Sequence, residues 1–262
     1  MSMSSPIATP SQPPPTTTSP PYDRLKAVKQ FDETKAGVKG LIDSGIKTIP
    51  SIFIHPPETL SDLAPGSGPE PEIPIIDLSV VHSSHATVVD QIRNAASTVG
   101  FFQVINHGIS LELMRSVIGA MKAFHEQPAD VRAQLKMGPV AADEKEIPEV
   151  CRKEVMEWDR EVVRVGDILL GLLSEGLGLG AERLAELGLS QGRMVSNEDY
   201  KSADHRVLAN PSNEPRVSIA VFLNPGDREK LFGPLPELTS EQKPALYRDF
   251  TLNEFMTRYV VE

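Results

Sequence analysis

The sequence predicts an α+β protein in which helices come first and strands come late. Apolar residues recur at helical spacing through most of residues 22–190. Strict alternation of apolar and polar residues becomes dominant only after Met194. Glycines and prolines separate the periodic segments. Because helices and strands occupy different parts of the chain, segregated α and β layers are favoured over alternating βαβ units.

Composition narrows the classes of function. The 262 residues carry a net charge of −10, which argues against nucleic acid and anionic membrane surfaces as partners. A single cysteine excludes an internal disulfide and a cysteine-based zinc cluster. No apolar run reaches the length of a membrane span, and the first residues lack the pattern of a secretory signal. We therefore expect a cytoplasmic protein without a membrane partner.

The N-terminal residues divide into a tail, a helix and a linker. Residues 1–21 are rich in Pro, Ser and Thr and contain no charge, which predicts a disordered tail. Residues 22–44 show helical periodicity and predict one helix that ends at Gly45. Prolines then predict extended chain around residues 50–57, and Gly and Pro predict a linker over residues 62–72.

From residue 73 onward, apolar periodicity, helix-capping residues and helix-breaking Gly and Pro predict the remaining strands and helices. Short strands are expected at residues 73–78 and 101–105, and helices at residues 86–99 and after the capping residue Ser110. After an irregular stretch at 135–147, a long amphipathic helix is expected over residues 148–177 and a short helix over 181–187. Two strands at 195–207 and 215–223, a hairpin loop at 210–214 and a helix at 250–259 with a Thr251/Glu254 capping box complete the prediction.

The predicted hairpin contains the candidate metal-binding and carboxylate-binding residues. His205 stands in Ser-Ala-Asp-His-Arg-Val at residues 202–207, and Arg216-Val-Ser218 begins eleven residues later. Taken singly, these residues are more readily explained as a solvated histidine and a surface arginine. His107, in a strand-end turn, is more readily explained by structural hydrogen bonding than by ligation, and Trp158 by core packing.

Several segments together resemble the plant 2-oxoglutarate/Fe(II)-dependent dioxygenases, which are iron/ascorbate-dependent oxidoreductases. The similarity is greatest to the homologues of 1-aminocyclopropane-1-carboxylate oxidase. The segments that carry it are residues 31–45, Ile-Pro-Ile-Ile-Asp-Leu at 73–78, Gly-Phe-Phe-Gln-Val-Ile-Asn-His-Gly at 100–108, residues 162–179, residues 202–207 and Pro-Arg-Val-Ser-Ile-Ala-Val-Phe-Leu-Asn-Pro at 215–225.

The resemblance implies a fold, a site and a reaction. It implies an N-terminal non-haem dioxygenase domain at residues 22–137 and, at residues 148–262, a remnant of the double-stranded β-helix (jelly roll) domain. His205 would be an Fe(II) ligand, and Arg216 and Ser218 would bind the distal carboxylate of 2-oxoglutarate. The implied cofactors are Fe(II) and 2-oxoglutarate, with ascorbate as reductant. The implied reaction is oxidation, such as hydroxylation, of a small plant metabolite.

The sequence also departs from that family. The family holds iron with His-x-Asp and a later His, yet none of the six histidines here has Asp or Glu two residues later. Gly192-Arg-Met194 runs directly into Val195-Ser-Asn197, without the strands that would carry His-x-Asp, and a second gap is expected near residues 135–138. We interpret the chain as internally truncated, through alternative splicing or a mispredicted gene, and therefore as inactive.

Three hypotheses remain open. A working oxygenase would need replacement ligands such as Glu198 or Asp199 near His205. An inactive member would bind a partner or have no function, and exposed strand edges at Ile219, Val221 and Leu223 would favour self-association. A non-enzymatic helical interaction module would be built from residues 22–190.

Overall fold

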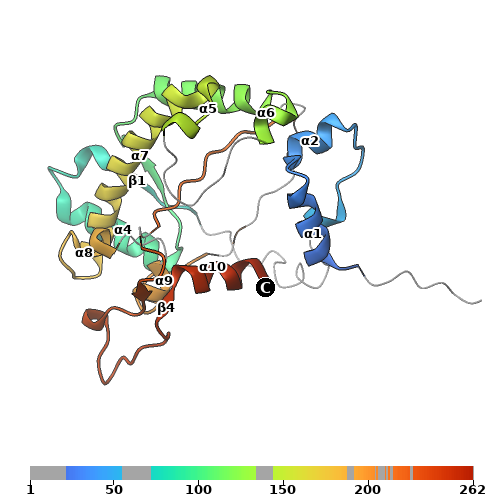
Figure 1. Cartoon of the computed structure of the whole chain (residues 1–262). Coiled ribbons are helices and arrows are strands. Elements are labelled where there is room, and N and C mark those ends of the chain that lie inside the picture. The colour runs from blue at the N-terminus through green and yellow to red at the C-terminus, as the bar shows by residue number, and fades with distance from the viewer. Residues whose placement is uncertain are drawn as a thin grey trace, which may run out of the picture.

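The computed structural model describes residues 22–54, 72–133, 144–187, 192–203, 205, 210, 212, 215–224 and 227–261. Helices make up most of its regular structure (Figure 1). In chain order the elements are α1 (Arg24–Glu33), α2 (Gly37–Asp43), η1 (Ser51–Phe53), β1 (Ile75–Asp77), η2 (Leu78–Val80), α4 (His85–Thr98), β2 (Gln103–Ile105), α5 (Leu111–His125), α6 (Ala129–Ala133), η3 (Glu144–Glu146), α7 (Glu149–Gly176), α8 (Arg183–Leu187), α9 (Gly192–Val195), β3 (Leu231–Phe232), η4 (Pro236–Leu238), β4 (Phe250–Thr251) and α10 (Leu252–Val261).

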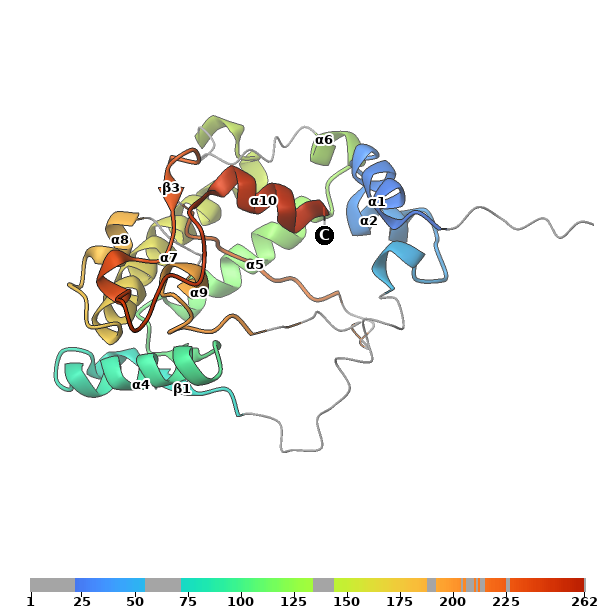
Figure 2. The same ribbon diagram turned by 90° about the horizontal axis from the view of Figure 1, so that it is seen from below.

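Helix α7 is the central element of the fold. It is 28 residues long and begins directly after Pro148, which sits at the cap position. Val165 and Leu172 of α7 belong to one buried cluster, whereas Leu170 belongs to a second. Helices α4, α5 and α8 contact α7 along its length (Figures 1 and 2). The long amphipathic helix expected at residues 148–177 is thereby confirmed.

The first cluster joins a small parallel sheet to α4 and α7. Strands β1 and β2 pair in parallel, with Ile76 opposite Val104, and α4 makes the crossover that parallel strands require. The side chains of Ile76, Val88 and Ile92 are at most 1% exposed. These elements confirm the strands expected at 73–78 and 101–105 and the helix expected at 86–99.

The second cluster gathers the C-terminal residues against the other side of α7. Strands β3 and β4 are antiparallel, and they bury Phe232 and Phe250. At the start of α10 the Thr251 hydroxyl accepts a hydrogen bond from the Glu254 amide at 3.1 Å, and the Glu254 carboxylate accepts one from the Thr251 amide at 3.0 Å. The predicted capping box is confirmed.

The single helix expected at residues 22–44 is wrong, because two helices occupy this segment. Lys35 and Gly37 adopt positive φ values of 54° and 61°, so the chain turns between α1 and α2. Helix η1 stands where extended chain was expected, and Phe53 packs edge-to-face against Phe31 at 5.7 Å. Arg132 of α6 donates a hydrogen bond to the Ala36 carbonyl at 3.4 Å, which connects the segment of α1, α2 and η1 to α6.

The two strands expected in the hairpin are also wrong. Val195 ends helix α9, residues 196–200 are turns and bends, and residues 215–224 form no strand. A lone hairpin is marginal in water unless further strands or helices pack on it, and the described residues offer 215–224 no strand to pair with. The tail at 1–21, most of the linker at 62–72 and most of the loop at 210–214 lie outside the described residues.

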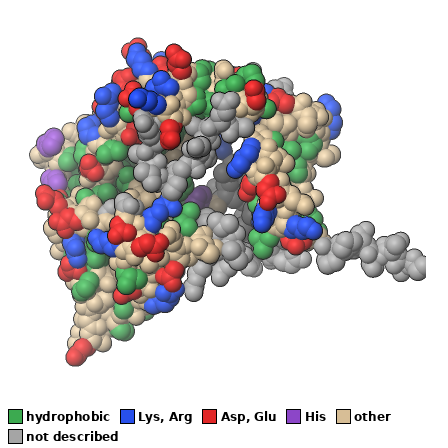
Figure 3. All heavy atoms as spheres, viewed as in Figure 1, with side chains coloured by type: hydrophobic (Ala, Val, Ile, Leu, Met, Phe, Trp, Pro, Cys, Tyr) green, Lys and Arg blue, Asp and Glu red, His purple; other side chains and the backbone are tan. Residues whose placement is uncertain are grey.

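The described part is therefore helix-rich, with four short strands in two two-stranded sheets rather than a multistranded jelly roll. Acidic and basic side chains are mixed over the face seen in Figure 3, with apolar side chains between them. None of the described helices combines the length and the apolar character needed to cross a membrane.

Candidate metal and co-substrate site

His205 is exposed and lies against the residues that lead into β2. Its ring meets that of Phe101 edge-on, with centroids 5.1 Å apart. Its Nδ1 lies 3.1 Å from the Ala203 carbonyl oxygen. A carbonyl can only accept, so Nδ1 carries the proton and Nε2 is the ring nitrogen left for a metal. The tautomer of His205 therefore suits ligation through Nε2.

Arg216 and Ser218 are two residues apart in a segment, residues 215–224, without regular secondary structure. Residues two apart in extended chain point to the same face, and both side chains are exposed. Within the described part of the chain, neither makes a hydrogen bond or an ion pair. No contact among the described residues joins these two side chains to each other or to His205.

The carboxylates that could replace the missing iron ligands are engaged elsewhere. Asp199 receives both of its short contacts from Lys243, whose Nζ lies 2.6 Å from each carboxylate oxygen. Glu198 accepts hydrogen bonds from the Tyr247 hydroxyl at 2.5 Å and from Arg193 at 3.0 Å. These two donors hold the pKa of the Glu198 carboxyl below its ordinary value. Both acids therefore serve as ion-pair partners in the junction after α9.

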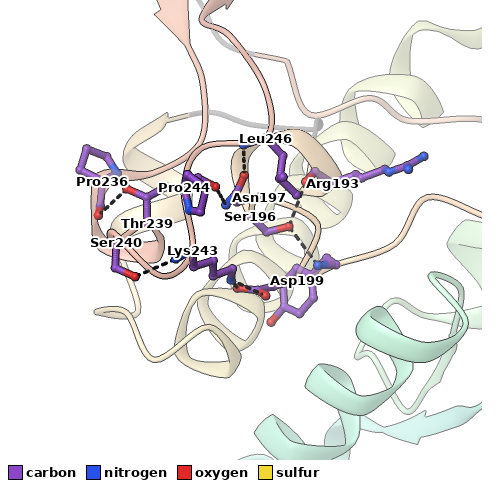
Figure 4. Close-up of polar contacts among 11 residues, drawn as sticks. Arg193, Ser196, Asn197, Asp199, Pro236, Thr239, Ser240, Lys243, Pro244 and Leu246 are labelled. Atoms are coloured by element: carbon purple, nitrogen blue, oxygen red, sulfur yellow. Dashed lines mark hydrogen bonds and ion pairs between the residues drawn. The ribbon is translucent and has the colours of Figure 1, made fainter.

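That junction is a folded, hydrogen-bonded structure (Figure 4). Asn197 is 1% exposed and has a φ of 51°. Its Oδ1 accepts from the Leu246 amide at 2.8 Å, and its Nδ2 donates to the Pro244 carbonyl at 3.1 Å. The Ser196 hydroxyl accepts from the Tyr200 amide at 3.0 Å. The pair Ser196-Asn197 is a turn signal that could have indicated this loop in place of a strand.

His107 and Trp158, the other two residues singled out in the sequence, differ in whether their ring nitrogens find a partner among the described residues. The His107 Nδ1 accepts a hydrogen bond from the Ile109 amide at 3.2 Å, so its predicted structural role is confirmed. Trp158 on α7 is half-buried, and its indole Nε1 is buried without a hydrogen-bond partner in the structure. A surface hollow of about 550 Å³ lies beyond the end of α7, between that loop, α8 and Glu237. None of His205, Arg216 and Ser218 lines it.

The described residues do not fit an Fe(II) centre. Non-haem iron of this kind needs two histidines and one carboxylate on one face. No group of three or more His, Cys, Asp or Glu side chains within the described ranges is placed to hold a metal ion. Among the described residues, His205 therefore has no neighbouring side chains that could complete such a centre with it.

Comparisons with known proteins define the family. Residues 73–160 match the family described as non-haem dioxygenase in morphine synthesis N-terminal. The chain is 30% identical to 1-aminocyclopropane-1-carboxylate oxidase homolog 5 of Arabidopsis thaliana, over 90% of this chain and 86% of the relative. This chain belongs to the plant 2-oxoglutarate/Fe(II)-dependent dioxygenase family. A second relative of this dioxygenase is deacetoxyvindoline 4-hydroxylase of Catharanthus roseus, 27% identical over 90% of this chain and 85% of that protein.

Solved structures support the same fold. The dioxygenase is similar to JOX2, solved in complex with 2OG, Fe and JA, with a TM-score of 0.65 over 91% of this chain and 93% of that one. It is similar to the dioxygenase for auxin oxidation of rice, with a TM-score of 0.61 over 72% and 95% of the two chains. Sequence identity is 19% in both cases, so these two structures are evidence for the fold alone.

The sequence alignment also measures what this dioxygenase lacks. The match to homolog 5 extends over 344 positions, whereas this chain has 262 residues. At least 82 of those positions, the difference between the two numbers, therefore have no residue here. The aligned part nevertheless spans 90% of the chain, so these missing positions fall inside the matched region.

Proposed function

We propose that this chain is a non-catalytic member of the 2-oxoglutarate/Fe(II)-dependent dioxygenase family. The observation that carries the proposal is that no histidine in the 262 residues is followed two residues later by Asp or Glu. The motif is absent from the sequence itself and not merely from the described residues. The solved relative JOX2 holds 2OG and Fe; this chain keeps only His205, Arg216 and Ser218 of the residues that the family resemblance assigns to iron and co-substrate.

Coordination chemistry explains why one histidine is insufficient. Two histidines and a carboxylate hold Fe(II) on one face and leave three positions open for co-substrate and oxygen. A single exposed imidazole gives no chelation, so Fe(II) exchanges with water and with buffer. Without a metal site the chain does not hold Fe(II). The part of 2-oxoglutarate binding that goes through the metal is therefore lost as well. Ascorbate, the reductant implied by the family, has no bound iron to act on.

The lack of at least 82 aligned positions supports an internal truncation as the origin of this loss. The junction at residues 192–200 lies where the strands with His-x-Asp would be expected. There Asn197 and Asp199 tie the shortened chain to residues 243–246. An incomplete jelly roll, in the sense of a domain missing its early strands, accounts for both features.

A role as an interaction module is the second candidate. Helices α1, α2 and η1 contain no buried residue. Val38 and Ile42 of α2, and Ile54 directly after η1, are 56–60% exposed. An uncovered apolar face of this kind is typical of a surface that binds a partner. A chain without oxygenase chemistry would act through such contacts.

The proposal is tested by adding Fe(II) and 2-oxoglutarate to the folded chain without oxygen. The family complex gives a weak visible metal-to-ligand charge-transfer band. We expect no band from this chain, while an intact relative that carries His-x-Asp gives one under the same conditions. A band that disappears in the His205→Ala variant would overturn the proposal, because it would require a rebuilt iron site.

The clamp is tested separately, without metal. Arg216 offers two parallel donors to a carboxylate, which lysine cannot match. Calorimetric titration with 2-oxoglutarate, beside Arg216→Lys and Ser218→Ala variants, reports whether the clamp alone retains the co-substrate. We expect weak binding that both variants reduce.

A further inference from the structure

Residues 216–223 form a segment that behaves like a strand without a partner. Val217, Ile219 and Leu223 are half-buried, whereas Arg216, Ser218, Ala220 and Phe222 are exposed, as is Val221. Except at Val221, this pattern has the period of two of a β-strand with one covered face. The covered face lies toward the helices, because Leu223 packs on the second cluster and beside Gly166 of α7. The segment runs without an arrow in Figures 1 and 2.

The backbone of this segment is unpaired. None of its amide or carbonyl groups makes a hydrogen bond within the described part of the chain. An extended segment with free amide and carbonyl groups is a template for pairing with another strand. Phe222 is 74% exposed and Val221 is 45% exposed, so apolar area accompanies the free backbone.

The composition of the segment favours pairing with itself. Val217 to Leu223 contain no charge, no proline and no glycine, and five of the seven residues are Val, Ile, Phe or Leu. Short segments of high β-propensity and low charge are those that self-associate. Pro215 and Pro225 bound the segment, and proline cannot donate to a ladder, so pairing is confined to the nine residues between them.

Charge decides the direction of pairing. Arg216 is the one charged residue of the segment. In a parallel, in-register pair the two arginines would be neighbours about 4.8 Å apart and would repel. In an antiparallel pair centred on Ala220 they lie at opposite ends, about 27 Å apart at 3.4 Å per residue, beyond the Debye length. That register also places Val217 opposite Leu223 and Ile219 opposite Val221, so an apolar face continues from one copy to the other.

We propose that residues 216–223 are the dimer interface of this protein and pair antiparallel with the same segment of a second copy. The occupant is a second copy because each copy brings the same unpaired edge, whose single charge, Arg216, lies at one end and is kept apart from its counterpart by antiparallel pairing, as a two-fold interface allows. The proposal goes beyond the loss of catalysis and does not rest on it. The net charge of −10 on each copy opposes association, so salt should strengthen the dimer.

Sedimentation velocity on the full chain, over a wide concentration range at low and high salt, tests the proposal. We expect a concentration-dependent dimer that is favoured by salt. Ala220→Pro removes a ladder donor in the centre of the segment and should weaken dimerisation by at least about tenfold. The matched variant Ala220→Val keeps a strand former and should dimerise at least as well as the wild type. Circular dichroism checks that all three chains keep their helices.

A second pair of variants tests which residues lie opposite each other in the paired strands. In a Cys151→Ser background, Ala220→Cys places two thiols opposite each other and should form disulfide-linked dimers quickly. Arg216→Cys places them at opposite ends and should not. Three results would overturn the proposal: a monomer at every concentration and salt, an Ala220→Pro chain as dimeric as the wild type, or equally fast cross-linking at 216 and 220. The second of these would place the interface elsewhere, for example on the apolar face of α1 and α2.

Discussion

The side-chain oxygen of Asn197 accepts a hydrogen bond from the backbone amide of Leu246 at 2.8 Å, across 49 residues of sequence. The amide of the same side chain donates to the Pro244 carbonyl. One buried side chain thus provides hydrogen-bond partners for two backbone groups of the 244–246 loop. Without Asn197 these groups would be shielded from water and would have no other partner. The junction after α9 is therefore held by specific bonds.

Replacing Asn197 should destabilise the fold. Asn197→Ala removes both hydrogen bonds and forces alanine into a positive φ, so we expect unfolding to become easier by about 2–4 kcal/mol. Asn197→Gly also loses the bonds but tolerates the backbone, and should recover about 1 kcal/mol of that loss. Urea unfolding of the three chains measures both quantities. Equal stability of the wild type and Asn197→Ala would show that the junction contributes nothing.

Gly176 and Tyr200 should be energetically coupled. The Tyr200 hydroxyl donates to the Leu173 carbonyl at 2.6 Å, and a Cβ on Gly176 would lie 2.6 Å from that hydroxyl oxygen. Gly176→Ala should therefore cost about 1–3 kcal/mol despite the better helix propensity of alanine. In a Tyr200→Phe background the clash is relieved, so the same change should cost about 1 kcal/mol less. A double-mutant cycle measured by thermal unfolding checks this, and strict additivity would contradict it.

Asp77 should make stability depend on pH on the acid side. Its carboxylate accepts hydrogen bonds from Ser79 and from Asn106, which hold its pKa below the ordinary value. Folding lowers the pKa of this carboxyl below its unfolded value, near 3.9. The group therefore stabilises the folded state at pH values above that unfolded pKa. This stabilisation disappears as the pH falls through the folded pKa. The stability difference between the wild type and Asp77→Asn should therefore be largest near neutral pH and shrink below about pH 4.

Asp90 offers a matched control for that measurement. It lies on α4 and makes no hydrogen bond or ion pair within the described part of the chain. Asp90→Asn should leave unfolding unchanged over the same pH range. A difference for Asp77→Asn that grows toward low pH would reverse the expected sign and contradict the assignment.

Local signals predicted the helices well where breakers and caps coincide with an apolar stripe. Pro148 and the glycines at 176 and 178 bound α7 as expected, and the Thr251/Glu254 box starts α10. The helix at 22–44 failed because Lys35, a residue that rarely takes positive φ, adopts one at the turn. Nothing in the local periodicity marks that break.

Strand predictions failed for a different reason. The alternation at residues 217–223 describes which side chains are covered except at the exposed Val221, but a strand also needs a neighbour to complete its hydrogen bonds. At Ser196 and Asn197, contacts to residues 193, 200, 244 and 246 override the strand propensity of the surrounding sequence. Both outcomes depend on residues distant in sequence, which local periodicity does not report.

The candidate site stays a prediction from the sequence. His205, Arg216 and Ser218 are exposed, and no contact among the described residues brings them together. The absence of His-x-Asp is a property of the sequence and needed no structure. The partners of Glu198 and Asp199 could not be foreseen, because Tyr247 and Lys243 lie more than forty residues away in sequence.

The most direct test of the central claim is the amount of Fe(II) that stays with the folded chain. The protein would be incubated with Fe(II) and 2-oxoglutarate without oxygen, passed through a desalting column, and analysed for iron beside His205→Ala and an intact relative. The loss of the His-x-Asp ligands predicts iron in the relative and only background in both forms of this chain. Retention near one iron per chain, abolished by His205→Ala, would contradict the claim that this dioxygenase has lost its metal site.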